Sequence, residues 1–101
     1  MEKTAVVYGR GFEVLLSNER AQAARMVIEQ GGVEGGPGDR HEKSDQWLFV
    51  ISGEGVAVVN GKEIRLKPGS LVLIEKGDTH EIRNTDTNPL EMLNFYVPPA
   101  Y

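Results

Sequence analysis

The chain has 101 residues, no cysteine and a net charge of −4, from 11 basic and 15 acidic side chains. This length suits one domain, residues 1–101, with a single core. The lack of cysteine excludes disulfide bonds, thiolate zinc sites and a cysteine nucleophile. Because charges of both signs are scattered and no basic block occurs, nucleic acid is not an expected partner.

The N-terminal residues MEKTAVVYGRGF contain no long apolar segment followed by a small-residue cleavage site, so no secretory signal is expected. Apolar runs such as 47–51 and 56–59 are far shorter than the ~20 residues that span a bilayer. The sequence therefore predicts a cytoplasmic protein without a membrane partner.

Turn-forming residues divide the chain into short segments, and a spacing of about eight to twelve residues between turns is typical of an all-β sandwich or barrel. The first expected strand is 12–16, inside an N-terminal strand region 10–17. The core of the barrel is expected over about 20–97, followed by a C-terminal tail 98–101 that covers an edge or contacts another subunit.

The segment 19–30 is ambiguous, because its composition favours a helix while apolar Ala24, Met26 and Ile28 alternate with their neighbours. The surrounding β pattern favours a strand there. Residues 31–38 contain five glycines and one proline, so a loop is expected.

The rest of the chain predicts a series of short strands. Asn60-Gly61 is the sequence of a type I′ hairpin turn, which favours a hairpin between the strands on either side. In total we expect nine or ten strands and no helix, with the later strands at 47–51, 56–59, 63–66, 71–74, 80–83 and 90–97.

The stretch GSLVLIEKGDTHEIRN, residues 69–84, fits the pattern G-x5-P-x-G-x2-H-x3-N except that Glu75 replaces the proline. It resembles the second motif of the cupin superfamily. The members of this superfamily are small double-stranded β-helix barrels that hold a metal or a small ligand inside. The resemblance implies that His80 points into the barrel as a metal ligand. It also implies an all-β, jelly-roll-like fold and a homodimer.

The first cupin motif, G-x5-H-x-H-x3or4-E-x6-G, is matched less completely. Gly53 closes it and Gln46 stands where the family has glutamate, but the middle is one residue short. If His41 is the first histidine, Lys43 takes the second position; if His41 is the second, Asp39 takes the first. We favour the second alignment, because a lysine that faces the barrel interior is costly.

The candidate metal ligands are therefore His41, Gln46 and His80, with Asp39 as a further possibility. Imidazole nitrogen and carboxylate oxygen bind divalent ions at about 2.0–2.3 Å. The neutral Gln46 removes one negative charge, so the sequence does not distinguish iron, manganese, nickel and zinc. A glutamine in a barrel that bonds to substrate or backbone is the alternative role.

Strand periodicity assigns Gln46, Leu48 and Val50 to one face and residues 47, 49 and 51 to the other, unless a bulge near 44–45 resets the alternation. Aromatic residues on strands pack by default in the core or between subunits. Besides the metal ligands, the side chains expected to line the pocket are Leu48, Arg25, Arg83 and Tyr96.

Three functions stay open. The first is a divalent-metal site that acts on or binds a small molecule, as a metal-dependent dioxygenase or isomerase if the protein is an enzyme. The second is a metal-free module that binds a sugar, sugar acid or other small metabolite. The third is a structural or regulatory dimer without catalysis.

Overall fold

The computed structural model describes residues 1–7 and 9–101, apart from the side chains of 37–39. These residues form nine strands and no helix, in agreement with the sequence. In chain order the strands are β1 Gly11–Ser17, β2 Gln22–Ile28, β3 Val33–Arg40, β4 Asp45–Ser52, β5 Gly55–Val59, β6 Lys62–Leu66, β7 Leu71–Ile74, β8 Thr79–Asn84 and β9 Leu90–Val97.

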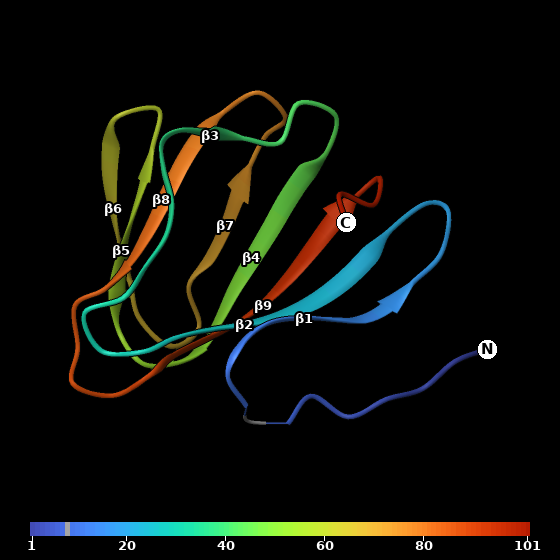
Figure 1. Cartoon of the computed structure of the whole chain (residues 1–101), viewed down its shortest axis with the longest axis horizontal. Helices are drawn as coiled ribbons and strands as arrows, with labels where there is room; N and C mark the ends of the chain where they lie inside the picture. The colour runs from blue at the N-terminus through green and yellow to red at the C-terminus, as the bar shows by residue number, and fades with distance from the viewer. Residues whose placement is uncertain (8) are drawn as a thin grey trace.

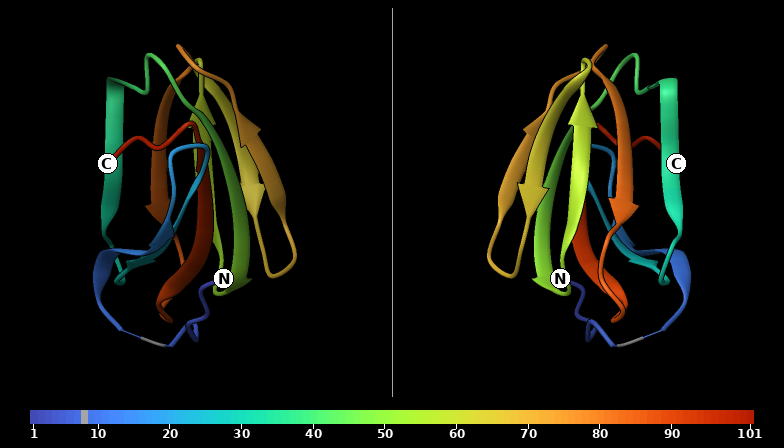
Figure 2. Two further views of the ribbon diagram at one scale, coloured as in Figure 1. Left: turned by 90° about the vertical axis from the view of Figure 1, so that its right-hand side faces the viewer. Right: turned by 90° about the vertical axis from the view of Figure 1, so that its left-hand side faces the viewer.

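Two antiparallel sheets face each other in a double-stranded β-helix (Figure 1; Figure 2). The larger sheet has the strand order β1-β2-β9-β4-β7, and the smaller one has the order β3-β8-β5-β6. Each sheet also pairs strands that are far apart in the sequence, such as β2 with β9 and β3 with β8. Strands from both halves of the chain therefore meet in the interior.

The hydrophobic core fills the space between the two sheets. Every strand from β4 to β9, together with β2, contributes to it, because alternate residues on each strand point inward. The buried apolar residues of this core are Met26, Ile28, Leu48, Val50, Ala57, Leu66, Ile74, Ile82, Leu90 and Met92.

The predicted alternation along β4 is confirmed. Gln46, Leu48 and Val50 are at most 1% exposed, whereas the side chains between them on the other face, at 47 and 49, are exposed. The register shift in this strand lies between Val50 and Ser52, in its pairing with β9, and therefore leaves the earlier residues in phase.

Two predictions of local structure are confirmed. Asn60 and Gly61 both have positive φ, 51° and 79°, as a type I′ turn requires, and Val59 pairs with Lys62 on either side. The ambiguous segment 19–30 contains the strand β2, which pairs with β1 and β9.

The expectation of a loop over 31–38 is wrong, because β3 begins at Val33. Gly35 and Gly36 pair with Glu81 and His80 of β8, and this pairing uses backbone groups only. At Gly35, φ is +77° and an added Cβ would lie 2.6 Å from the carbonyl oxygen of His80. The glycines thus permit a close approach of two backbones beside His80.

The N-terminal residues 1–7 run outside the two sheets and are exposed (Figure 1). Within the described part of the chain, no helix has the length and apolar character needed to cross a membrane.

Candidate functional site

The only two histidines of the chain lie next to each other, although 39 positions separate His41 from His80 in the sequence. His80 is on β8, two residues before the core residue Ile82, so both side chains share the inner face. His41 follows β3 in the loop that leads to β4. The ring centres are 5.1 Å apart and the planes are inclined by 22°.

The loop that carries His41 is tied to the turn before β8. Gly77 N donates to the carbonyl oxygen of His41 at 2.8 Å, and Lys76 N donates to Asp45 Oδ1 at 2.9 Å. These two bonds connect the segments that carry the two histidines. They explain how a loop residue is held beside a strand residue.

Gln46 lies beside the histidines in the interior and is 1% exposed. Its Nε2 donates to Asn94 Oδ1 at 3.1 Å, while its Oε1 and the Nδ2 of Asn94 have no hydrogen-bond partner among the described residues. His80 Nδ1 is also buried without a partner in the described part of the chain. The interior therefore contains polar atoms that can receive a ligand.

Asn94 was not identified from the sequence. It lies on β9, where Leu90, Met92, Asn94 and Tyr96 form the inward row. One polar residue in an otherwise apolar or aromatic row is the sequence signal that could have indicated it, since buried amides are usually hydrogen-bonded.

The electrostatic setting favours the neutral form of His41. Burial lowers the pKa of His41 below its ordinary value, and the neighbouring His80 lowers it further. The Gln46 side chain, whose oxygen could accept from a protonated ring, acts in the opposite direction and is the weakest of the three effects. An unprotonated imidazole has a nitrogen lone pair available for a metal ion or a ligand proton.

A cavity of about 260 Å³ opens onto the two histidines. Its lining residues are Glu34, Gly35, Arg40, His41, His80 and Tyr101.

Tyr96 is not among the residues that line this cavity; it is fully buried, with its ring centre 5.2 Å from that of His41 in an edge-on contact. Burial raises the pKa of the Tyr96 phenol, and the neighbouring Tyr101 and Glu34 raise it further. The phenol therefore stays protonated at neutral pH.

The other candidate residues occupy different places. Leu48 is fully buried and belongs to the hydrophobic core. Arg25 is on the opposite face of β2, where its Nη1 donates to Val7 O at 3.1 Å and lies 3.5 Å from Glu13 Oε1. The Arg83 side chain is 56% exposed on the outer face of β8. The structure thus does not bring the two arginines to the histidines.

The side chain of Asp39 lies outside the described residues. Lys43 is exposed to solvent. Among the described residues, no group of three or more histidine, cysteine, aspartate or glutamate side chains is placed to hold a metal ion. The donors that do converge are two imidazoles and the amide oxygen of Gln46, and none of these three groups is a carboxylate.

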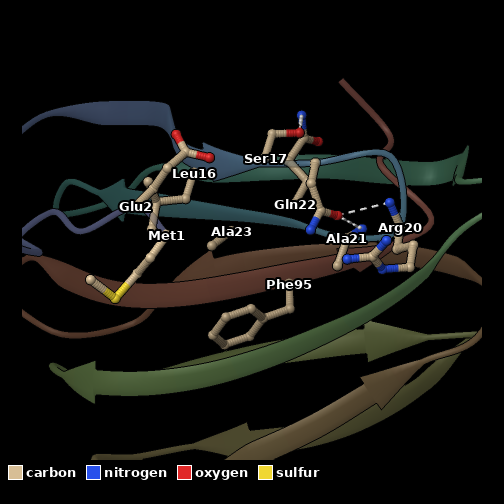
Figure 3. A pocket seen from close by; sticks show the side chains of 10 residues that line it. Met1, Glu2, Leu16, Ser17, Arg20, Ala21, Gln22, Ala23 and Phe95 are labelled. Atoms are coloured by element: carbon tan, nitrogen blue, oxygen red, sulfur yellow. Dashed lines mark hydrogen bonds between the residues drawn. The ribbon is translucent and has the colours of Figure 1, made fainter.

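A larger hollow of about 540 Å³ lies elsewhere, beside the N-terminal residues and the β1–β2 hairpin (Figure 3). Met1, Leu16 and Phe95 contribute apolar surface to it, while Glu2 and Arg20 are its charged residues. It has neither of the histidines, so its size alone does not make it the functional site.

Comparisons with known proteins show the family to which this fold belongs. The profile of the family described as "Cupin domain" matches residues 24–96. An oxalate-binding protein of Thermotoga maritima is 32% identical over 78 residues, which is 77% of this chain and 63% of the relative. The chain spans 63%, 49% and 41% of the lengths of three curated relatives that it matches.

Two solved structures share the fold. One, from Bacillus halodurans, has a TM-score of 0.84 at 25% identity and covers 91% of this chain and 73% of that chain. The other, from Thermotoga maritima and described as a predicted oxalate decarboxylase, has a TM-score of 0.78 at 30% identity. That match covers 87% of this chain and 79% of the other.

Proposed function

The chain belongs to the cupin family, and we propose that it binds a small polar molecule at a weak divalent-metal site formed by His41, His80 and Gln46. The observation that carries the proposal is the convergence of the only two histidines beside a buried amide oxygen that has no hydrogen-bond partner among the described residues. Imidazole nitrogen and amide oxygen are both ligands of divalent ions in proteins.

The donor set fits a weakly bound ion. Burial favours the neutral form of His41 that metal ligation requires, but the described residues of the cluster supply no carboxylate. A bound ion would act as a Lewis acid that polarises an oxygen of the small molecule. Iron, manganese, nickel and zinc all accept these ligand types, so the proposal includes each of them.

The small molecule would enter through the cavity above the histidines. Arg40 and Glu34 line its rim with opposite charges, so a polar ligand is favoured over an apolar one. The names of the relatives support this class of ligand, since one of them is an oxalate-binding protein. The cytoplasmic location predicted from the sequence is part of the same proposal.

A metal-free binding module is the second candidate, and the unpaired atoms favour it. Gln46 Oε1, Asn94 Nδ2 and His80 Nδ1 are all buried without partners among the described residues. Because a buried polar atom without a partner costs about 1–3 kcal/mol, a sugar or organic acid that bonds to these atoms would stabilise the fold without any metal.

We further propose a homodimer through the outer face of the larger sheet. Trp47 of β4 is 41% exposed and pairs with Leu73 of β7 and Phe95 of β9, so these three side chains form one exposed row. Phe49, Leu71 and Val97 extend the same apolar face. Exposed apolar patches of this kind mark protein–protein contacts.

Elemental analysis of the untagged protein tests the metal proposal. Wild type dialysed to equilibrium against iron, manganese, nickel or zinc should retain metal above the concentration in the dialysate, and the double variant His41→Ala, His80→Ala should not. Arg83→Ala is the matched control, because it changes the same strand on its outer face and should retain the ion. No retained metal in wild type would exclude the first candidate.

The second candidate is tested on the metal-stripped protein by thermal denaturation with small sugars and organic acids. A rise in the melting temperature that His80→Ala abolishes would support direct binding.

Light scattering during size-exclusion chromatography tests the proposed dimer. Phe49→Asp should give a monomer, and an unchanged mass would contradict the proposed face.

A further inference from the structure

The C-terminal residues cover one side of the cavity that opens onto the two histidines. β9 ends at Val97, and residues 98–101 continue outside the sheet. Tyr101 lines the cavity together with His41 and His80. Its ring centre is 5.6 Å from that of His41 and the two planes are nearly perpendicular, at 81°. An aromatic ring thus forms a wall of the proposed site.

Two further rings support this wall. The Tyr101 ring centre lies 4.7 Å from that of Phe12 and 5.1 Å from that of Tyr96. Phe12 comes from β1 and Tyr96 from β9, which are separated in the sheet by β2. The wall is therefore positioned by contacts from both sides of that strand.

One buried side chain holds the backbone of this segment. Gln22 of β2 is 4% exposed, and its Oε1 accepts from Tyr101 N at 2.9 Å and from Ala100 N at 3.2 Å. Its Nε2 donates to the main-chain oxygen of Tyr101 at 2.7 Å. An amide is suited to this role because it can donate and accept at the same time.

We propose that Gln22 is a positioning residue that holds Tyr101 as a gate over His41 and His80. Residues 98–101 belong to no strand, and the ring contacts and the three bonds to Gln22 help to keep the gate in place. When those bonds break, Tyr101 can swing away and widen the route to the histidines. This inference rests on the proposed function, since it concerns access to the same site.

The rate at which diethyl pyrocarbonate modifies the two histidines measures this access. The reagent attacks unprotonated imidazole, and the chain has only two such rings, which peptide mass spectrometry can distinguish in the untagged protein. Gln22→Ala should speed modification of His41 at least about tenfold, because it removes three hydrogen bonds and each lost bond shifts the closed state by about two- to tenfold. Tyr101→Ala should have a similar effect.

Two conservative variants separate the gate from a general loosening of the fold. Tyr101→Phe keeps the ring and its contacts with Phe12 and Tyr96, so it should react more slowly than Tyr101→Ala. Gln22→Glu can still accept from Ala100 N and Tyr101 N but cannot donate, so its rate should lie between those of wild type and Gln22→Ala. Circular dichroism before modification checks that each variant is folded. If Gln22→Ala does not fold, Tyr101→Ala still tests the gate, because Tyr101 is at an exposed position.

Equal rates in wild type and folded Tyr101→Ala would overturn the inference. So would a Tyr101→Phe rate equal to that of Tyr101→Ala, because the ring would then not be the barrier. These rates are measured without metal or ligand. A faster reaction in the variants combined with no metal or ligand binding in wild type would therefore remove the proposed function and leave the gate. Metal or ligand binding in wild type combined with unchanged rates in the variants would remove the gate and leave the proposed function.

Discussion

Replacement of Gln46 by glutamate tests how strongly the proposed metal site depends on charge. Gln46 is almost fully buried and its Nε2 donates to Asn94 Oδ1. Glutamate cannot make this bond, so the oxygen of Asn94 loses its partner at a cost of about 1–3 kcal/mol. The buried carboxylate adds a further cost. We expect metal-free Q46E to be less stable than wild type by about 2–4 kcal/mol in urea denaturation.

A divalent ion should reverse much of this loss. The carboxylate supplies the negative charge that the amide lacks, so Q46E should bind Mn²⁺ at least tenfold more tightly than wild type, a difference of about 1.4 kcal/mol. At a free Mn²⁺ concentration of roughly 100 times Kd, binding stabilises the folded state by about 2.7 kcal/mol. The assay is urea denaturation of the metal-stripped proteins at increasing Mn²⁺, with Kd from calorimetry.

Gln46→Leu is the matched control, because it removes the same hydrogen bond to Asn94 without adding a charge. It should lose stability and gain no affinity for Mn²⁺. The reasoning is refuted if the glutamate and leucine variants bind Mn²⁺ equally weakly. It is also refuted if His80→Ala leaves the affinity of Q46E unchanged, since the ion would then be bound elsewhere.

Three other changes have expected outcomes. Leu48→Ala empties a fully buried core position and should lower the unfolding free energy by about 2–5 kcal/mol in urea; a loss below about 1 kcal/mol would contradict the packing. Burial and the second imidazole lower the pKa of His41 below 6.5, so on acidification the unfolded chain binds a proton before the folded chain does. The unfolding free energy measured in urea should therefore fall as the pH drops below 6.5. His41→Gln should make this fall smaller. Gly53→Ala places a Cβ 2.3 Å from Pro89 O at a φ of +86° and should lower the melting temperature more than Gly61→Ala, where φ is +79° but no atom lies within 4 Å; equal losses would show that the clash is relieved.

Much of the fold could be predicted because it depends on local chemistry. The alternation of apolar residues assigned the inner face of β4, and Asn60-Gly61 identified a hairpin turn from the backbone conformations that these two residues tolerate. The strand β3 was missed for the opposite reason. Its pairing with β8 uses only backbone groups, and a glycine-rich sequence gives no side-chain pattern that would reveal it.

The candidate site was predictable only where a motif named its residues. The motif positions of His41 and His80 are adjacent in space, and Gln46 lies beside them. Periodicity could not decide whether the arginines faced inward, and both lie on outer faces, Arg25 with the N-terminal segment and Arg83 exposed. The alternation of residues along one strand does not show which of its two faces another segment of the chain will cover.

The sequence by itself determined the all-β class, the turns and the family motifs, because these depend on residue type and short spacing. Only the tertiary structure revealed that Gln46 bonds to Asn94 and that Gln22 holds Tyr101. Gln46 and Asn94 are 48 positions apart in the sequence, and Gln22 and Tyr101 are 79 positions apart. Such contacts arise from the pairing of β9 with β2 and β4, and no local preference of either residue encodes that long-range register.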